Sequence, residues 1–293
     1  MDAQSHIRPV ATKPFLLPEG NVQISFSGGR TSAYMLHQIL EANGDLPERC
    51  KVIFANTGRE MPETLDFVQE CSLRWSVPII WLEYKKDKNG VGFNVVNHNS
   101  ASRNGEPFDN MIFHRRMLPN LFQRFCTSEL KVLTIRRYLV SCGWKKWNTA
   151  VGIRADESHR AKENNDSKMT VYYPLNKAMI GISDVTEFWK KQKLDFDFDL
   201  NITKGFGNCD GCFLKSEQTI ANLWRMHPDR AKWWAEQEAR EFKGKDPKRH
   251  HLQRFKRDKA SYAEIKDFIS RQGDWVFEQE GLFCQADDGE CTG

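Results

Sequence analysis

The sequence has no apolar run that approaches the length of a membrane span, and residues 1–20 contain no apolar stretch of signal-peptide type. We therefore expect a cytoplasmic protein with a loose N-terminal arm and no contact with a membrane. No internal repeat and no low-complexity tract is present. Lysine and arginine outnumber aspartate and glutamate by only 43 to 39, and a net charge of +4 says little about partners by itself.

Disulfides are rare in a reducing compartment, so the even number of cysteines, eight, has no meaning here. Cys50, Cys71 and Cys142 lie among apolar residues and are predicted to serve packing. A length of 293 residues is long for one domain and short for three, and 40% hydrophobic residues are ample for a core. We expect one α/β core with an appended subdomain.

Residues 27–32, Ser-Gly-Gly-Arg-Thr-Ser, form a tight turn between a predicted strand at 22–26 and a predicted helix. The first N–H groups of such a helix and its dipole make an anion site. Gly28 and Gly29 would let a phosphate approach the backbone closely. A glycine turn that merely caps a helix is the alternative interpretation.

Three further short apolar segments, at 51–55, 78–82 and 149–153, alternate with helical patterns. This order is typical of a parallel sheet with helices on both faces. Ligands of such sheets bind at the carboxyl ends of the strands. The turn at 27–32, which we call the phosphate loop, and the turn at 56–58 both lie at these ends. Periodicity fades between residues 85 and 120, so we expect a long loop over the site.

Helical patterns follow around residues 220–226 and 228–240, and Ser261 with Glu264 forms a capping box for a last helix. The expected division is an arm at 1–20, a nucleotide-binding domain at 21–216, and a mainly helical region with a short tail at 217–293.

The segment 243–259 holds eight lysines and arginines and two histidines. A solvated face is the common outcome for such a run, and a contact with a nucleic-acid backbone is the functional alternative.

The turn at 27–32 resembles the PP-loop motif Ser-Gly-Gly-x-Asp-Ser, with Thr31 in place of the aspartate. Three later segments resemble other motifs of the proteins that carry this loop. Residues 54–64 resemble their strand-two motif. Residues 124–131 resemble the motif Arg-Trp-Cys-Thr…Lys, and residues 152–160 resemble Gly-x-Arg-x-x-Glu-Ser…Arg. Residues 21–216 thus resemble the phosphoadenosine phosphosulfate (PAPS) reductase family. The resemblance implies an adenine-nucleotide α-hydrolase-like, Rossmann-type fold.

The resemblance also implies a site for ATP or a related adenine nucleotide, with Mg²⁺ as a possible companion. The residues it places at the nucleotide are Ser25, Ser27, Gly28, Gly29, Thr31, Ser32, Asn56, Thr57, Gly58, Gly152, Arg154, Glu157, Ser158 and Arg160. Those it assigns to catalysis are Arg30, Thr31, Lys131 and Arg154. Arginine suits oxyanions because its planar fork binds them bidentately. The alternative for Arg154 and Arg160 is ion pairing with Asp156 or Glu157.

Cys209 and Cys212 form a Cys-x-x-Cys pair, which fits a redox dithiol, half of a zinc site or ligands of an iron–sulfur cluster. A second such pair, which would favour zinc, is lacking. Some relatives of the resembled family carry a [4Fe-4S] cluster. We therefore expect one [4Fe-4S] cluster on Cys126, Cys209, Cys212 and Cys284, with zinc as the second hypothesis and a bare redox pair as the third.

Three functions compete. The first is an enzyme that cleaves ATP at the α-phosphate, releases pyrophosphate and supports sulfur transfer to a nucleic acid or small molecule. The second is a true sulfonucleotide reductase. Glu290-Cys291 resembles the start of the reductase tail Glu-Cys-Gly-Leu-His, whose cysteine attacks the sulfate sulfur, but the rest of that tail is missing. The third is a nucleotide-responsive binding protein without turnover, which Thr31 supports. Homo-oligomerisation stays open.

Overall fold

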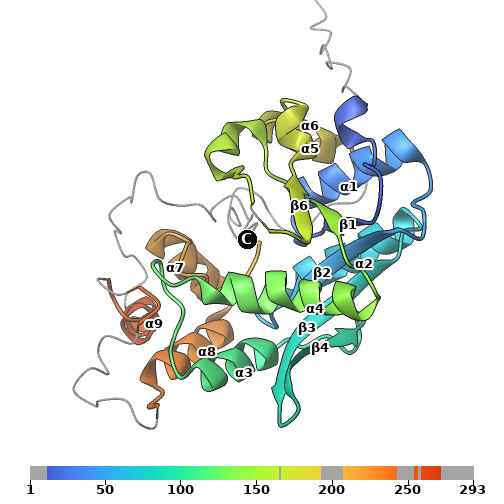
Figure 1. The fold of residues 1–293 in the computed structure, drawn as a ribbon. Helices are drawn as coiled ribbons and strands as arrows, with labels where there is room; N and C mark the ends of the chain where they lie inside the picture. Colours follow the sequence, from blue (N-terminus) through green and yellow to red (C-terminus); the bar gives the residue numbers. More distant parts are fainter. Residues whose placement is uncertain (1–11, 165, 193–206, 243–253, 257–258, 272–293) are drawn as a thin grey trace, which may run out of the picture.

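The computed structural model describes residues 12–164, 166–192, 207–242, 254–256 and 259–271. Its centre is a six-stranded sheet in the order β4-β3-β2-β1-β5-β6 (Figure 1). The strands are β1 (Val22–Ser25), β2 (Cys50–Asn56), β3 (Ile79–Asp87), β4 (Gly90–Val96), β5 (Trp147–Ala150) and β6 (Met169–Tyr172). All neighbours pair in parallel except β3 and β4.

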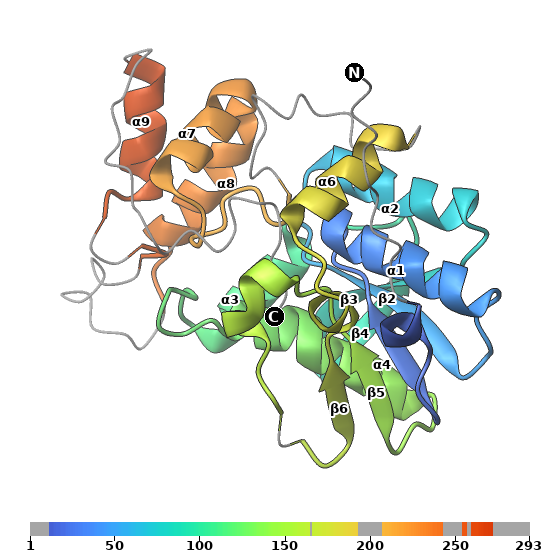
Figure 2. The same cartoon turned by 90° about the horizontal axis from the view of Figure 1, so that it is seen from above.

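The described helices form two groups, one around the sheet and one in the C-terminal region (Figures 1 and 2). Those of the sheet domain are η1 (Lys13–Phe15), α1 (Arg30–Asn43), α2 (Pro62–Arg74), α3 (Glu106–Arg115), η2 (Thr127–Leu133), α4 (Thr134–Ser141), η3 (Ala155–Arg160), α5 (Pro174–Lys177) and α6 (Ile182–Lys191). Those of the C-terminal region are α7 (Glu217–Met226), α8 (Pro228–Ala239) and α9 (Tyr262–Arg271). None of the described helices is long and apolar enough to span a bilayer.

One face of the sheet is packed by α1, α2 and α6. Alternate strand residues such as Ile24 and Phe54 point to this face, as the two-residue period of a strand requires. They meet Leu36 of α1, Val68 of α2 and Trp189 of α6 in one buried cluster. This packing confirms the α/β class that the sequence predicted.

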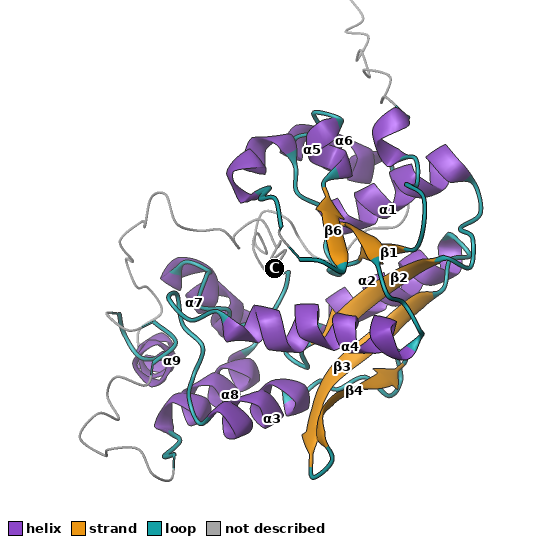
Figure 3. Ribbon diagram, in the orientation of Figure 1, coloured by secondary structure: helices purple, strands orange, loops and turns teal. Residues whose placement is uncertain are grey.

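The opposite face is only half covered. Helix α4 packs Leu139 on Ile53 of β2 and Leu82 of β3, together with Trp144 and Trp147. Figure 3 shows α4 crossing this side of the sheet. Odd-numbered residues of β1, β5 and β6 line an open cavity instead, and this half-face is where the candidate site lies.

Residues 85–120 are not the irregular loop that we expected. They include the end of β3, the antiparallel edge strand β4 and helix α3. Strand β4 lacked a signal because Gly90, Gly92 and Asn94 replace the apolar residues of a buried strand. Helix α3 does show a helical pattern in the sequence, since Phe108, Met111 and Ile112 recur at i, i+3 and i+4.

Gly28 is needed for packing. Its φ is +82°, and a Cβ there would lie 2.9 Å from Thr64 Cγ2 and 3.1 Å from Phe54 Cε2. The expected space for a phosphate beside this glycine is therefore filled by α2 and β2 side chains. The glycine lets the phosphate loop sit directly on the core.

We predict that Gly28→Ala lowers the free energy of unfolding by about 2–4 kcal/mol, because a left-handed alanine and an overpacked contact add their costs. Gly44→Ala is the matched control: Gly44 has a φ of +71° with nothing within 4 Å of its Cβ position. It should lose only about 1 kcal/mol. Urea unfolding measures both, and equal losses would show that the contacts at Gly28 relax without cost.

Candidate functional site

A cavity of about 740 Å³ lies on the uncovered half-face of the sheet. Its floor combines polar side chains of Gln23, Ser25 and Thr149 with apolar strand residues. The hydroxyl of Thr149 is buried and has no hydrogen-bond partner in the part of the chain that the structure describes. Cations line the cavity at Arg124, Lys131, Arg160 and Lys162. Volume and lining suit a small anionic ligand.

The phosphate loop borders this cavity through Ser27, next to Ser25 at the end of β1. The Ser27 amide and hydroxyl bond to Ser32 Oγ at 3.1 and 2.9 Å, and Ser32 Oγ donates to the Gly29 carbonyl at 2.9 Å. Gly152 packs against the same loop, since a Cβ there would lie 3.3 Å from Ser32 Cα. The predicted loop is thus a preformed turn at the start of α1.

Arg154 is buried inside the protein, with 1% of its surface exposed. Its Nη1 donates to Thr31 Oγ1 at 3.2 Å, and its Nε donates to Asp156 Oδ1 at 3.0 Å. It also pairs with Glu157 at 3.6 Å. Arg154 therefore links α1 to η3 through the ion pairs that the alternative interpretation named, and its contact with a bound anion stays a prediction.

The other arginine of this segment, Arg160, lines the cavity and pairs with Glu157. Ser158 lies beside them, donates to the Ala155 carbonyl and accepts from Asn176 at 2.8 Å. Arg30 opens α1, and its carbonyl accepts from Trp189 Nε1 at 3.0 Å.

The turn after β2 contacts other parts of the molecule. Asn56 is buried, donates to Glu83 at 2.6 Å and accepts from the Gly58 amide at 3.0 Å. Gly58 has a φ of +79° and packs against Pro107, whose Cδ would be 2.9 Å from an added Cβ. Thr57 lines a second cavity, described next.

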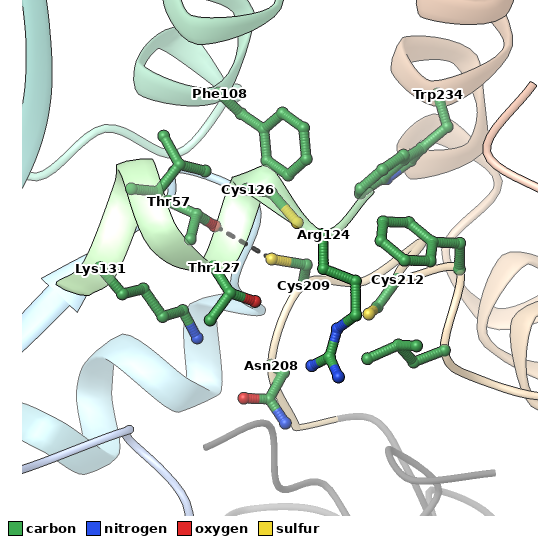
Figure 4. A pocket seen from close by; sticks show the side chains of 13 residues that line it. Thr57, Phe108, Arg124, Cys126, Thr127, Lys131, Asn208, Cys209, Cys212 and Trp234 are labelled. Atoms are coloured by element: carbon green, nitrogen blue, oxygen red, sulfur yellow. Dashed lines mark hydrogen bonds between the residues drawn. The ribbon is translucent and has the colours of Figure 1, made fainter. Parts of the chain in front are cut away.

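This second cavity, the cysteine cavity, gathers three of the four predicted ligands, Cys126, Cys209 and Cys212 (Figure 4). Its volume is about 30 Å³, roughly the room of one water molecule. Apolar side chains such as Phe108 and Trp234 form much of its wall. Among the described residues, no three histidine, cysteine, aspartate or glutamate side chains are grouped to hold a metal ion. Cys284 and Cys291 lie outside the described residues.

The thiol of Cys209 is held in its neutral form. Burial raises the pKa of Cys209 well above its usual range, and Glu60 raises it further. Lys131 and the hydrogen bond with Thr57 act against this, and the Sγ and Oγ1 atoms lie 3.2 Å apart. A thiolate at this position therefore needs additional positive charge, which a bound metal group supplies.

Asn208 is a functional candidate that the sequence did not reveal. It has a left-handed backbone with φ +61° and lines the cysteine cavity. Its side chain is 3% exposed, and neither amide atom has a partner among the described residues. Buried amides are normally hydrogen-bonded, so these two atoms are suited to a ligand in the cavity.

The two cavities share a wall. Arg124, Thr127 and Lys131 line both of them. Thr127 and Lys131 belong to η2, a π-helix that runs into α4, and π-turns occur frequently at functional sites. The sequence singled out Lys131 but did not predict that Arg124 and Thr127 would stand between a nucleotide cavity and the cysteines.

Asp210 fixes the loop between the two cysteines, although its side chain lies outside the cavity lining. It is fully buried and accepts from Arg59 Nη2 at 2.6 Å, from Arg230 Nε, and from Trp234 Nε1 at 2.5 Å. Its amide donates to the Arg59 carbonyl at 2.8 Å. These bonds tie the Cys-x-x-Cys loop to the turn after β2 and to α8.

Fold and site together define an α/β protein with a glycine-containing turn before α1 and a cavity lined by cations on one half of the sheet. Residues 21–170, just over half of the chain, match the family model of the phosphoadenosine phosphosulfate reductase domain. The chain belongs to this family. A relative described as an uncharacterized nin region protein ORF290 of Escherichia phage lambda is 31% identical over 204 residues, which cover 67% of each protein.

Two solved structures are similar at low identity. The PAPS reductase of Candida auris in its phosphate complex is 15% identical, with a TM-score of 0.41 over 60% of this chain and 75% of that one. The U34-tRNA thiolase NcsA of Methanococcus maripaludis, solved with its [4Fe-4S] cluster, is 12% identical. Its TM-score is 0.42 over 63% of each chain.

We predict that Asp210→Asn lowers the free energy of unfolding by about 3–5 kcal/mol, because it leaves two buried guanidinium groups without their counter-charge. The matched control is Glu70→Gln, which removes an exposed pair with Arg74 on one helix and should cost about 0.5 kcal/mol or less. Urea unfolding compares them. Similar losses for the two variants would contradict the anchoring role of Asp210.

Proposed function

We propose that this protein binds ATP or a related adenine nucleotide in the large cavity and cleaves it at the α-phosphate. An oxygen of the acceptor attacks the α-phosphorus, pyrophosphate leaves, and the adenylated acceptor is then ready for substitution by sulfur. The observation that carries this proposal is the wall of Arg124, Thr127 and Lys131, which borders both the large cavity and the cysteine cavity.

The large cavity suits a nucleotide for three reasons. Its cations match a polyphosphate, and arginine and lysine both bind phosphate oxygens. The start of α1 lies next to Ser27, so backbone donors and the helix dipole favour an anion at this edge. Apolar residues of the lining, such as Val151 and Val171, offer a surface for a base. Mg²⁺ would accompany a triphosphate.

The three thiol side chains of the cysteine cavity are of the type that holds an iron–sulfur cluster. Cys126, Cys209 and Cys212 would hold it, with Cys284 as the predicted fourth ligand. Bound there, a [4Fe-4S] cluster would supply redox-active iron beside the nucleotide. Lys131 would offset the thiolate charge, and the apolar walls would exclude water. The cavity is small, so the cysteine side chains would have to move apart to admit a cluster while the Asp210 bonds hold the loop.

Zinc is the second hypothesis for this site. It needs four ligands around one ion at about 2.3 Å from each sulfur. The described residues provide no grouped set of ligands for either metal, and Cys284 lies outside them. Elemental analysis therefore separates the two hypotheses.

The second candidate function is sulfonucleotide reduction, which the family membership itself favours. Thiols next to a nucleotide cavity would also serve that reaction. The products separate the two: pyrophosphate appears from ATP, and sulfite appears from a sulfonucleotide. Tight nucleotide binding without release of either product would indicate a regulatory protein that does not turn the nucleotide over.

Protein purified without oxygen should be brown and contain about four irons per chain. Serine at Cys126, Cys209 or Cys212 should remove the iron, because each change deletes one thiolate. Cys142→Ser is the control, since Cys142 is exposed and lies outside the cavity. Elemental analysis and the visible spectrum give the answer. A content of one zinc and no iron per chain would show that the site holds a structural zinc ion and no cluster.

Pyrophosphate release from ATP should fall about 10- to 150-fold in kcat/KM in Lys131→Ala, the loss of one charged hydrogen bond in the transition state. Lys177→Ala is the control, because Lys177 is exposed and lines neither cavity. A coupled pyrophosphate assay with candidate acceptors measures both. Unmodified protein that binds ATP, retains its metal and releases no pyrophosphate would overturn the proposal.

A further inference from the structure

Strand β6 lies at the edge of the described sheet, beside β5. The Val151 amide donates to the Tyr172 carbonyl at 3.1 Å, so the backbone groups of this residue point toward β5. Successive residues of a strand alternate in direction, and the backbone groups of Met169 and Val171 therefore point away from β5. Such outward groups can pair with another strand unless the protein covers them.

The side chain of Asn164 binds two of these outward groups. Its Nδ2 donates to the Met169 carbonyl at 2.7 Å, and its Oδ1 accepts from the Val171 amide at 3.1 Å. A side-chain amide has the donor and the acceptor of a peptide group, so Asn164 bonds to β6 as a neighbouring strand would. Leucine has a similar size but could make neither bond.

A second bond fixes the same segment. The Tyr173 hydroxyl, just after β6, donates to the Lys162 carbonyl at 2.6 Å. Asn164 and Tyr173 together hold residues 160–164, which we call the edge loop, beside β6 (Figure 2). Arg160, Lys162 and Glu163 of this loop all line the large cavity. The covered sheet edge is thus also a wall of the candidate site.

The edge loop brings two cations and one carboxylate to the cavity. Arg160 shares its charge with Glu157. Lys162 is exposed, and none of the described residues forms an ion pair with it. Glu163 is also exposed, and its carboxylate opposes the binding of an anion. Lys162 is therefore the cation of this loop whose charge is open to a ligand.

We propose that the edge loop is a phosphate-binding segment of the large cavity. Lys162 contacts a phosphate group of the ligand, and Asn164 and Tyr173 are positioning residues that hold Lys162 in place. Bonds that already order a loop in the free protein reduce the entropy lost when a ligand binds. The inference deepens the proposed function by assigning a polyphosphate subsite, and it rests on that function only for the identity of the nucleotide.

Titration calorimetry of the full chain with inorganic tripolyphosphate, and separately with ATP, tests the proposal. Lys162→Ala should weaken the binding of both ligands roughly two- to fivefold, the range for one exposed ion pair. Asn164→Leu should weaken both to a similar extent, because it releases the segment that carries Lys162. Glu163→Gln should tighten both, since it removes a charge of the same sign as the ligand.

Asn148→Leu is the matched control. Asn148 also donates to a backbone carbonyl, that of Glu19 at 3.0 Å, but it does not line the cavity. This variant should leave both affinities unchanged. A double-mutant cycle then separates positioning from a general loss of structure. Asn164→Leu should add little in Lys162→Ala protein if it acts through that lysine, whereas a merely structural role would cause the same loss in both backgrounds.

Three results would overturn the inference: no binding of tripolyphosphate to the unmodified protein, unchanged affinity in Lys162→Ala, or an equal loss for Asn164→Leu in both backgrounds. Its failure is distinct from that of the proposed function. Tripolyphosphate binding that depends on Lys162, in a protein that releases no pyrophosphate from ATP, would count against the proposed function alone. Pyrophosphate release with unchanged kcat/KM in Lys162→Ala and Asn164→Leu would count against this inference alone.

Discussion

The candidate site depends on one buried carboxylate, Asp210. Removing this carboxylate from water is costly. Two guanidinium groups and an indole N–H offset the cost when all three contact the carboxylate, as they do in this fold. Arg59 comes from the turn after β2, and Arg230 and Trp234 come from α8. The same network thus joins the sheet domain, the Cys-x-x-Cys loop and the C-terminal helices. The cysteines face their cavity because the residue between them is anchored on the opposite side.

The second constraint is the missing cover on half of the sheet. A parallel sheet normally buries both faces, but here α4 packs on β2, β3 and β4 and leaves the other half of this face open. The floor over β1, β5 and β6 accordingly keeps polar residues such as Gln23 and Thr149, where a packed face would carry valine or isoleucine. The π-helix η2 lies at the border of the covered and open halves. It is therefore placed to present side chains to both cavities.

The sequence predicted the α/β class, the phosphate loop and three clustered cysteines because each depends on local pattern or on a motif order. It could not predict what the same residues contact over long range. Gly28 packs against α2, and Arg154 is buried between Thr31 and Asp156, which only the folded arrangement reveals. Strand β4 was missed because an edge strand needs few apolar residues, and Asp210 because nothing in Cys-Asp-Gly-Cys distinguishes a buried anchor from a solvated loop residue.

The shared wall also links the two cavities electrostatically. Lys131 lowers the pKa of Cys209 and lines the large cavity, so its charge acts on a thiol and on any bound phosphate at once. An anion in the large cavity would draw on this charge and favour the neutral thiol. By the reciprocity of linked equilibria, ionisation of the thiol would weaken the binding of that anion by the same factor. Under the proposed function, nucleotide binding and the ionisation of Cys209 would therefore be coupled through the charge of one side chain.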